Sequence, residues 1–407
     1  MGILTILLGL LCFIIPFGVF ERLQVIPSVF VYFHDLIIFP LFLFVLYKIT
    51  VKKEITRPGI LKGIVVFGLV GLISLLLNAR DLNLVDFFVS LSYLIRFLMY
   101  SSLIFIFDYL NIKKIYNLLK TLNLSLLLFV FFGFLQYLFS PSLKQFYVYG
   151  WDEHFYRLTS TYLDPNFAGI SILLYIILLF YFVMEAIKSK EKIAYPIITS
   201  FLSILALFLT YSRSAIVAFV FSAPALIIVE RRKRLLVLAL AIVIFAGILT
   251  PKNFNLVGLN PFRVFSSVER LKSIENAYKV FTTSPIYGVG FNSYRYAQKR
   301  IGFLDSQWEK THAGAGASNS YVFLLATTGI AGFLAFIYFI WEVVRYLIYD
   351  SKKTSYSLSK GVALASFTAV LVHSLFDNTF FYSFTMIILF YILGIMGYKV
   401  AKGYRKR

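Results

Sequence analysis

The sequence predicts an all-α integral membrane protein with about twelve transmembrane helices. Of its 407 residues, 60% are hydrophobic and 19% are aromatic, and the mean hydropathy is +0.83, far above ordinary soluble domains. Apolar runs of about 17 to 25 residues, long enough to cross a bilayer, recur along the chain. Neither a linker nor a low-complexity tract separates soluble domains, so we expect one polytopic domain over residues 1–407.

The apolar runs give the predicted helices in order. The first run has no basic residue before its apolar core and no clear small-residue cleavage site, so we expect a retained helix rather than a removed signal peptide. The twelve runs are residues 2–20, 28–47, 60–77, 84–107, 121–139, 167–184, 193–209, 214–229, 235–249, 321–344, 362–376 and 380–400.

The basic residues predict the orientation. An even number of helices puts both termini on one side, and with both ends cytoplasmic the inner segments hold 24 of the 39 Lys and Arg, as the positive-inside rule requires. The net charge of +20 therefore lies mostly in short inner loops, and we expect no nucleic-acid partner. Cys12 is the only cysteine, which excludes an internal disulfide and a cysteine-based metal cluster.

Residues 251–317 form the one long polar segment, a large extracytoplasmic loop between the ninth and tenth helices. Ser266 and Glu269 match a capping box, and a helical apolar pattern follows until Ser284 and Pro285. Two glycines, Gly288 and Gly290, predict a turn packed closely against another segment. The loop has nine basic and four acidic residues, so an anionic ligand is expected.

Ionisable residues gather near the predicted outer ends of the helices. Each costs about 2.5–3.5 kcal/mol inside a bilayer, so such groups serve function or are paired. On a helical wheel Arg270 falls on the apolar side of the loop helix, where it either snorkels to lipid headgroups or faces a site that the helix covers. The others are His34, Asp35, Arg80, Arg157, Arg213, His373 and Asp377, with Arg96 in mid-helix. The alternative is that each one only joins helices.

Four segments resemble the family of O-antigen ligases and O-antigen polymerases. They are Arg157-Leu-Thr-Ser-Thr-Tyr-Leu-Asp-Pro-Asn-Phe-Ala-Gly, Thr210-Tyr-Ser-Arg-Ser, Arg270 through Pro285-Ile-Tyr-Gly-Val-Gly, and Asn319 through Gly329 and Gly332. Each motif is loose, but their order and their placement between apolar runs are specific. Together they cover the chain from about residue 157 to 377.

The resemblance implies a membrane glycosyltransferase with its site at the outer face of the cell membrane. An acceptor hydroxyl of a glycan or lipid would attack an undecaprenyl-pyrophosphate-linked glycan, and lipid pyrophosphate would leave. Guanidinium groups suit that leaving group, with Arg213 first, then Arg157, Arg270 and Arg295. Ser318 and Asn319 would lie on the acceptor side. We expect no cofactor and no metal, because Asp152-Glu153-His154 is the only acidic cluster in the predicted outer segments and lacks an Asp-x-Asp pattern.

The general base is the open point. Many ligases of the family have a histidine immediately before the asparagine-like position of the last motif, where this chain has Ser318. Three readings remain: His312 acts from the glycine-rich hinge, His373 and Asp377 form an imidazole–carboxylate pair, or arginines alone suffice. His34 and His154 are expected to be structural.

The alternative to an enzyme is a protein of another functional class, a transporter or flippase for glycan. Carriers place substrate residues near mid-membrane, often in two related halves, whereas here the charge lies in an outer loop and the halves show no relation. Within the enzyme reading the sequence leaves ligase and polymerase equally open, since they differ mainly in acceptor.

Overall fold

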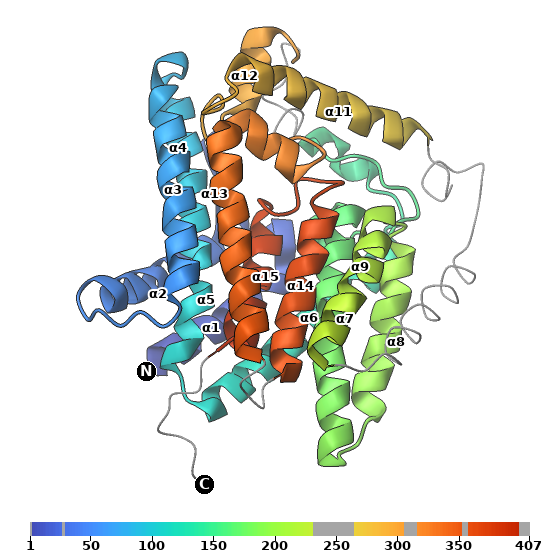
Figure 1. Ribbon diagram of the computed structural model, residues 1–407. Helices are drawn as coiled ribbons and strands as arrows, with labels where there is room; N and C mark the ends of the chain where they lie inside the picture. Colours follow the sequence, from blue (N-terminus) through green and yellow to red (C-terminus); the bar gives the residue numbers. More distant parts are fainter. Residues whose placement is uncertain (1, 27–28, 231–263, 305–315, 352–356, 399–407) are drawn as a thin grey trace.

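The protein is a helical bundle with one small β-hairpin (Figure 1). The computed structural model describes residues 2–26, 29–230, 264–304, 316–351 and 357–398. Within these, seven helices are long and apolar enough to cross a membrane and four further apolar helices are shorter. Eleven of the predicted runs coincide with helices, while the ninth, 235–249, lies outside the described residues.

The N-terminal part contains the hairpin, which the sequence did not predict. Helix α1 (Gly2–Ile14) continues as a 3-10 helix (Ile15–Glu21) into β1 (Arg22–Ile26), which pairs antiparallel with β2 (Val29–Tyr32). Helix α2 (Phe33–Thr50) follows. The predicted start of the second helix at residue 28 is therefore wrong. Its first residues, Val-Phe-Val-Tyr, are strand formers, and hydropathy alone does not separate strand from helix.

The segments that connect the next helices contain a buried ion pair. These helices are α3 (Pro58–Leu77), α4 (Leu84–Ser101), α5 (Leu103–Ile106) and α6 (Ile112–Phe139). Arg57 precedes α3 and donates to both carboxylate oxygens of Asp108 at 2.8 and 3.0 Å. It also donates to the carbonyls of Leu393 and Gly394 near the end of α15 (Ser383–Met396). Arg57 thus holds three segments together.

The mid-helix arginine is also paired. Arg96 of α4 donates to both carboxylate oxygens of Asp35 at 3.1 and 2.7 Å. The Asp35 carboxylate also accepts from the Tyr100 hydroxyl, which lies 2.8 Å from the His34 ring, and Glu21 holds the other side of that ring. These buried groups satisfy one another, so the helix-joining interpretation fits this cluster.

The C-terminal helices surround the region of interest. They are α7 (Pro165–Ser189), α8 (Ala194–Leu209), α9 (Arg213–Glu230), α13 (Ser320–Ser351) and α14 (Ser357–His373). Helix α14 packs on α9, and α13 packs on α3. Helix α15 is shorter than the predicted run 380–400 and begins at Ser383, because residues 374–382 form a non-helical connection that follows the end of α14 (Figure 1).

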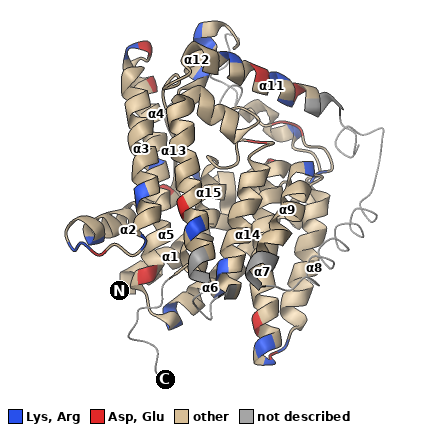
Figure 2. Ribbon diagram, in the orientation of Figure 1, with Lys and Arg blue, Asp and Glu red and all other residues tan. Residues whose placement is uncertain are grey.

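Two helices of the predicted loop, α11 (Val264–Thr283) and α12 (Tyr294–Ile301), lie across one end of the bundle (Figure 1). Helix α11 ends before Ser284 as predicted, but the capping box is wrong because Ser266 lies inside the helix. Figure 2 shows charged residues gathered on α11, on α12 and near helix ends, with mostly uncharged ribbon between.

The glycine turn crosses α13 at close range, as the sequence predicts. The amides of Val289 and Gly290 donate to the carbonyls of Ala326 and Thr327, both at 3.0 Å. Gly329 has φ +65° and interrupts α13, and a Cβ there would meet the carbonyl carbon of Ile286 at 2.3 Å. This backbone contact joins the end of α11 to α13.

Candidate functional site

The first part of the candidate site is the turn that presents Arg213. Helix α8 ends at Leu209, and Arg213 begins α9 with an exposed side chain. The buried Arg157 guanidinium donates to the carbonyls of Thr210 (2.9 Å) and Tyr211 (3.5 Å). In this structure Arg157, predicted as a diphosphate ligand, supports the turn that carries Arg213.

The second part comes from the loop helix above. Arg270 of α11 reaches Asp377, with 3.3 Å between its Nη2 and the carboxylate Oδ2. The two side chains are 24% and 21% exposed. The positive charges of Arg270 and Arg213 lie close enough to act on each other. Arg270 therefore points into a site beneath α11, one of the two possibilities that its place on the apolar side left open.

Asp377 lies at the centre of this group, in the connection between α14 and α15. Its carboxyl is hydrogen-bonded by the Asn166 side chain, whose Oδ1 accepts from Ser212 at 3.2 Å. Burial raises the pKa of Asp377 to about 7, while Arg270 acts to lower it and the charge of Asp164 acts to raise it further. Asp377 therefore changes charge near neutral pH.

The predicted His373–Asp377 pair is wrong. Helix α14 ends at His373, so the two residues do not share a helical face. The imidazole is fully buried, with Nε2 3.0 Å from the Ser214 hydroxyl and Nδ1 2.6 Å from the Thr379 hydroxyl. Both ring nitrogens of His373 thus join α14 to the start of α9 and to the following connection.

The other predicted site residues lie in different parts of the structure, and one of them is not described. His312 lies outside the described residues. Asn319 caps α13, with its Oδ1 accepting from the amides of Tyr321 and Val322, and the Ser318 amide donates to Ser273 of α11. Arg295 lies on α12, whose Arg300 reaches Asp81 in the α3–α4 turn. A role for Arg295 at a diphosphate stays a prediction.

Sequence reasoning quoted Asp164 and Asn166 only as part of a motif and missed their place in the site. Asp164 is the N-cap of α7 and accepts from the amides of Asn166 and Phe167 at 2.7 and 3.1 Å. Asp followed by Pro at the first helical position is a helix-start signal that the sequence contains. That signal places α7 but does not show that the Asp-Pro-Asn segment faces Arg270 and Asp377.

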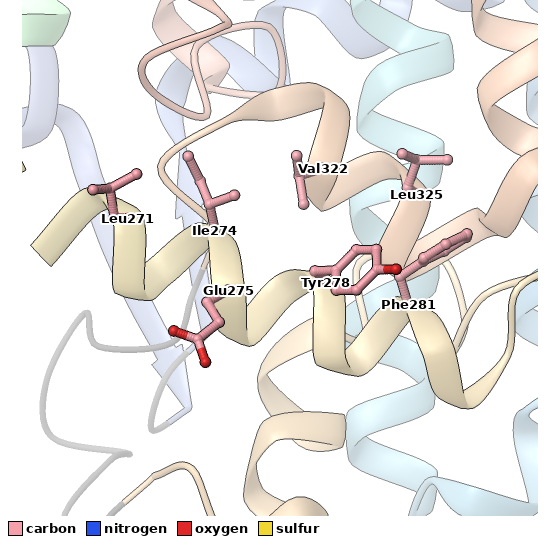
Figure 3. A pocket seen from close by; sticks show the side chains of 7 residues that line it. All are labelled: Leu271, Ile274, Glu275, Tyr278, Phe281, Val322 and Leu325. Atoms are coloured by element: carbon pink, nitrogen blue, oxygen red, sulfur yellow. The ribbon is translucent and has the colours of Figure 1, made fainter. Parts of the chain in front are cut away.

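An apolar groove of about 370 Å³ lies beside the charged groups, between α11 and α13. Figure 3 shows Leu271, Ile274, Tyr278 and Phe281 along α11 facing the side of α13 that carries Val322 and Leu325. Glu275 completes the lining. Ile274 of the lining lies one helical turn after Arg270 on α11, so one end of the groove is on the side of the helix that carries Arg270.

Residues 198–337 match a family model described as O-antigen ligase. This segment belongs to the O-antigen ligase family. The family predicted from the four motifs is thereby confirmed, and the ligase segment includes Arg213, Arg270 and the α13 crossing at Gly329. Asp164 and Asp377 lie outside the matched ligase segment but contribute to the same site. No curated protein matches the chain.

Proposed function

We propose that this protein is a glycosyltransferase that moves a glycan from undecaprenyl diphosphate to an acceptor hydroxyl at the outer face of the cell membrane. Two findings support the proposal: the O-antigen ligase segment and a membrane-type helical bundle with the charged helices α11 and α12 at one end. The acceptor is a glycan or a lipid, and the reaction needs neither cofactor nor metal.

The observation that carries the proposal is the approach of Arg270 to Arg213 at the N-terminus of α9. Two neighbouring guanidinium groups and a helix N-terminus together favour a dianionic ligand. In glycosyl transfer, charge builds on the leaving diphosphate as its bond to the sugar breaks. Arg213 and Arg270 would stabilise that charge, while Arg157 positions Arg213 through the Thr210–Tyr211 carbonyls.

The apolar groove suits the hydrocarbon part of the same donor. Ile274 of its lining lies one helical turn after Arg270 on α11, so a diphosphate held by Arg270 would place its attached chain near this end of the groove. Leu271 and Tyr278 are 66% and 59% exposed along it, and covering apolar surface is favourable by about 25 cal/mol per Å². Ser318 and Asn319 are half-buried just before α13, and we place the acceptor there.

Replacing Arg213 tests this assignment. We expect Arg213→Ala to lower transfer of glycan from purified lipid-linked donor about 100- to 1,000-fold, the usual cost of losing one group that stabilises transition-state charge. Arg213→Lys should recover only part of the rate, because lysine keeps the charge but loses the planar fork. Product is measured by the mobility shift of the glycosylated acceptor.

Arg80 provides the matched control. It is an exposed arginine in the outer α3–α4 turn, outside the site, so Arg80→Ala should transfer glycan at the wild-type rate. Full activity of Arg213→Ala in a folded protein would rule out the diphosphate assignment. Movement of solute into vesicles without any transfer would favour a transporter instead.

A further inference from the structure

The hydrogen bonds of His373 continue beyond its two direct partners. The Ser214 hydroxyl, which lies 3.0 Å from His373 Nε2, is also 3.0 Å from the Ser212 hydroxyl. The Ser212 hydroxyl donates to Asn166 Oδ1 at 3.2 Å, and the Asn166 side chain hydrogen-bonds the Asp377 carboxyl. These side chains, His373–Ser214–Ser212–Asn166, form a His373 network that leads from the end of α14 to Asp377.

The number of hydrogens fixes the direction of the His373 network. His373, Ser212 and Ser214 are at most 2% exposed, so their hydrogens are shared within the network rather than with bulk water. A serine hydroxyl has one hydrogen. Ser212 donates its hydrogen to Asn166, so Ser214 donates to the Ser212 oxygen. The Ser214 hydrogen is then used, and His373 Nε2 must carry a hydrogen and donate it to Ser214.

The other ring nitrogen of His373 agrees with this assignment. With its hydrogen on Nε2, a neutral imidazole accepts at Nδ1, and the Thr379 hydroxyl lies 2.6 Å from Nδ1 as the donor. Thr379 is also fully buried. His373 is therefore satisfied as a neutral ring, with one nitrogen donating and the other accepting.

At its other end the His373 network acts on a carboxyl group. Because Ser212 holds Oδ1 of Asn166, the amide nitrogen of Asn166 is the atom directed at Asp377. An N–H donor favours the ionised carboxylate over the neutral acid. The network therefore stabilises the charged form of Asp377.

Charged groups from other elements also face Asp377. Arg270 of α11 contacts it, and Asp164, the N-cap of α7, lies close enough to affect its ionisation. Beyond them, Arg213 of α9 lies near Arg270, and His154 Nε2 lies 3.9 Å from Asp164 Oδ2. The ionised form of Asp377 holds Arg270, while the neutral form leaves Arg270 to a diphosphate.

We propose that His373 is a positioning residue of the donor site. As a neutral imidazole with its hydrogen on Nε2, it fixes the direction of the hydrogen bonds that run through the two serines, and so keeps the Asn166 amide pointed at Asp377. The ring exchanges no proton with donor or acceptor. The inference rests on the proposed function, in which Arg270 binds the diphosphate.

Ser212→Ala interrupts the network in the full-length protein. We expect Asp377 to ionise about one pH unit higher, because its carboxylate loses a hydrogen bond to a charged group. The midpoint is read without donor, from the infrared absorption of the protonated carboxyl that Asp377→Asn removes. The rise of the donor Kd with pH should move upward equally. Ser212 also accepts from the Ala215 amide at 3.4 Å, so the Tm should fall as well, but only the midpoint reports on Asp377.

Two replacements of His373 test the ring itself. His373→Leu removes the Nε2 donor, so Ser214 can turn either way and the midpoint should rise by less than in Ser212→Ala. His373→Gln places an amide N–H near the position of Nε2 and should restore the wild-type midpoint. Ser203→Ala is the matched control, because Ser203 is equally buried but donates to the Thr199 carbonyl of its own helix at 2.7 Å. It should leave the midpoint unchanged.

The outcomes separate the two claims. An unchanged midpoint in both Ser212→Ala and His373→Leu overturns the inference, and if His373→Leu does not fold, Ser212→Ala alone decides. Loss of glycan transfer in His373→Gln at an unchanged midpoint would make the ring a general base and also overturn it. If the midpoints shift as expected but wild type transfers no lipid-linked glycan, the proposed function fails and the positioning of Asn166 stands.

Discussion

Asp377 ties the site to pH through its contact with Arg270. An ordinary aspartate ionises near pH 4, but burial raises the pKa of Asp377 to about 7. Below that pH the carboxyl is mostly neutral, and Arg270 is available to a diphosphate. Above it, the ionised carboxylate competes for Arg270. We therefore expect the Kd for the donor to increase as pH rises through about 7, and Asp377→Asn to bind donor tightly with little pH dependence.

The donor itself must not titrate in this measurement. A diphosphate esterified at both ends lacks the ionisation near pH 6 of a terminal phosphate, so lipid-linked glycan is the correct probe and free lipid diphosphate is not. Binding is measured by fluorescence quenching in detergent at fixed ionic strength. An equal slope of Kd with pH in wild type and Asp377→Asn would exclude Asp377 as the competing group.

The sequence predicted the surroundings of some site residues better than those of others. The helical wheel placed Arg270 on the apolar side of α11, but only the contact with Asp377 shows that it faces a covered site rather than lipid headgroups. Arg157, expected at the diphosphate, donates to the carbonyls of Thr210 and Tyr211, and its diphosphate role stays a prediction. Either role suits a guanidinium near a turn between helices, and the sequence alone does not show these carbonyl contacts. The position of His154, whose Nε2 lies 3.9 Å from Asp164 Oδ2, likewise depends on a loop with no periodic pattern.

At the scale of elements, the crossing of α13 by the glycine turn holds α11 over the site. Gly329 has positive φ, and a Cβ there would meet backbone atoms of Ile286 and Tyr287. Left-handed strain costs about 1–3 kcal/mol, and the clash with backbone atoms adds to it. We expect Gly329→Ala to lower the Tm and to reduce donor affinity, because Arg270 is carried by the displaced helix.

Gly9→Ala is the control for this change. Gly9 lies in α1, where a Cβ would meet nothing within 4 Å, so that variant should match wild type in both measurements. Melting is followed by the fluorescence of detergent-solubilised protein, and donor binding is followed as above. Wild-type binding and Tm in Gly329→Ala would mean that the crossing does not position α11.

The elements themselves were largely predictable, because membrane helices need long apolar runs and the chain has them. The misses have physical causes. The hairpin residues Val29–Tyr32 are apolar and strand-forming, so a hydropathy window joins them to α2. Likewise, Phe380, Phe381 and Tyr382 read as the start of a membrane helix, but α15 begins only at Ser383. Their rings instead pack against Phe336, Phe167 and Phe384.

At the scale of the whole molecule, the positive-inside bias predicts which end of the bundle faces outward. The site lies at the end that carries α11 and α12 (Figures 1 and 2). Cys12 is buried and is the only cysteine, so a Cys12→Ala background allows one new thiol at a time. Lys272 on α11 and Lys192 between α7 and α8 are exposed and lie at opposite ends of the predicted topology.

We expect Lys272→Cys to react with a membrane-impermeant maleimide in right-side-out vesicles, and Lys192→Cys to react only after the membrane is permeabilised. The Cys12→Ala parent should stay unlabelled in both conditions. Reversed labelling would place Arg213, Arg270 and Asp377 on the cytoplasmic side. Acceptors there would differ from a surface glycan, so the orientation decides whether the proposed transfer builds the cell envelope from outside.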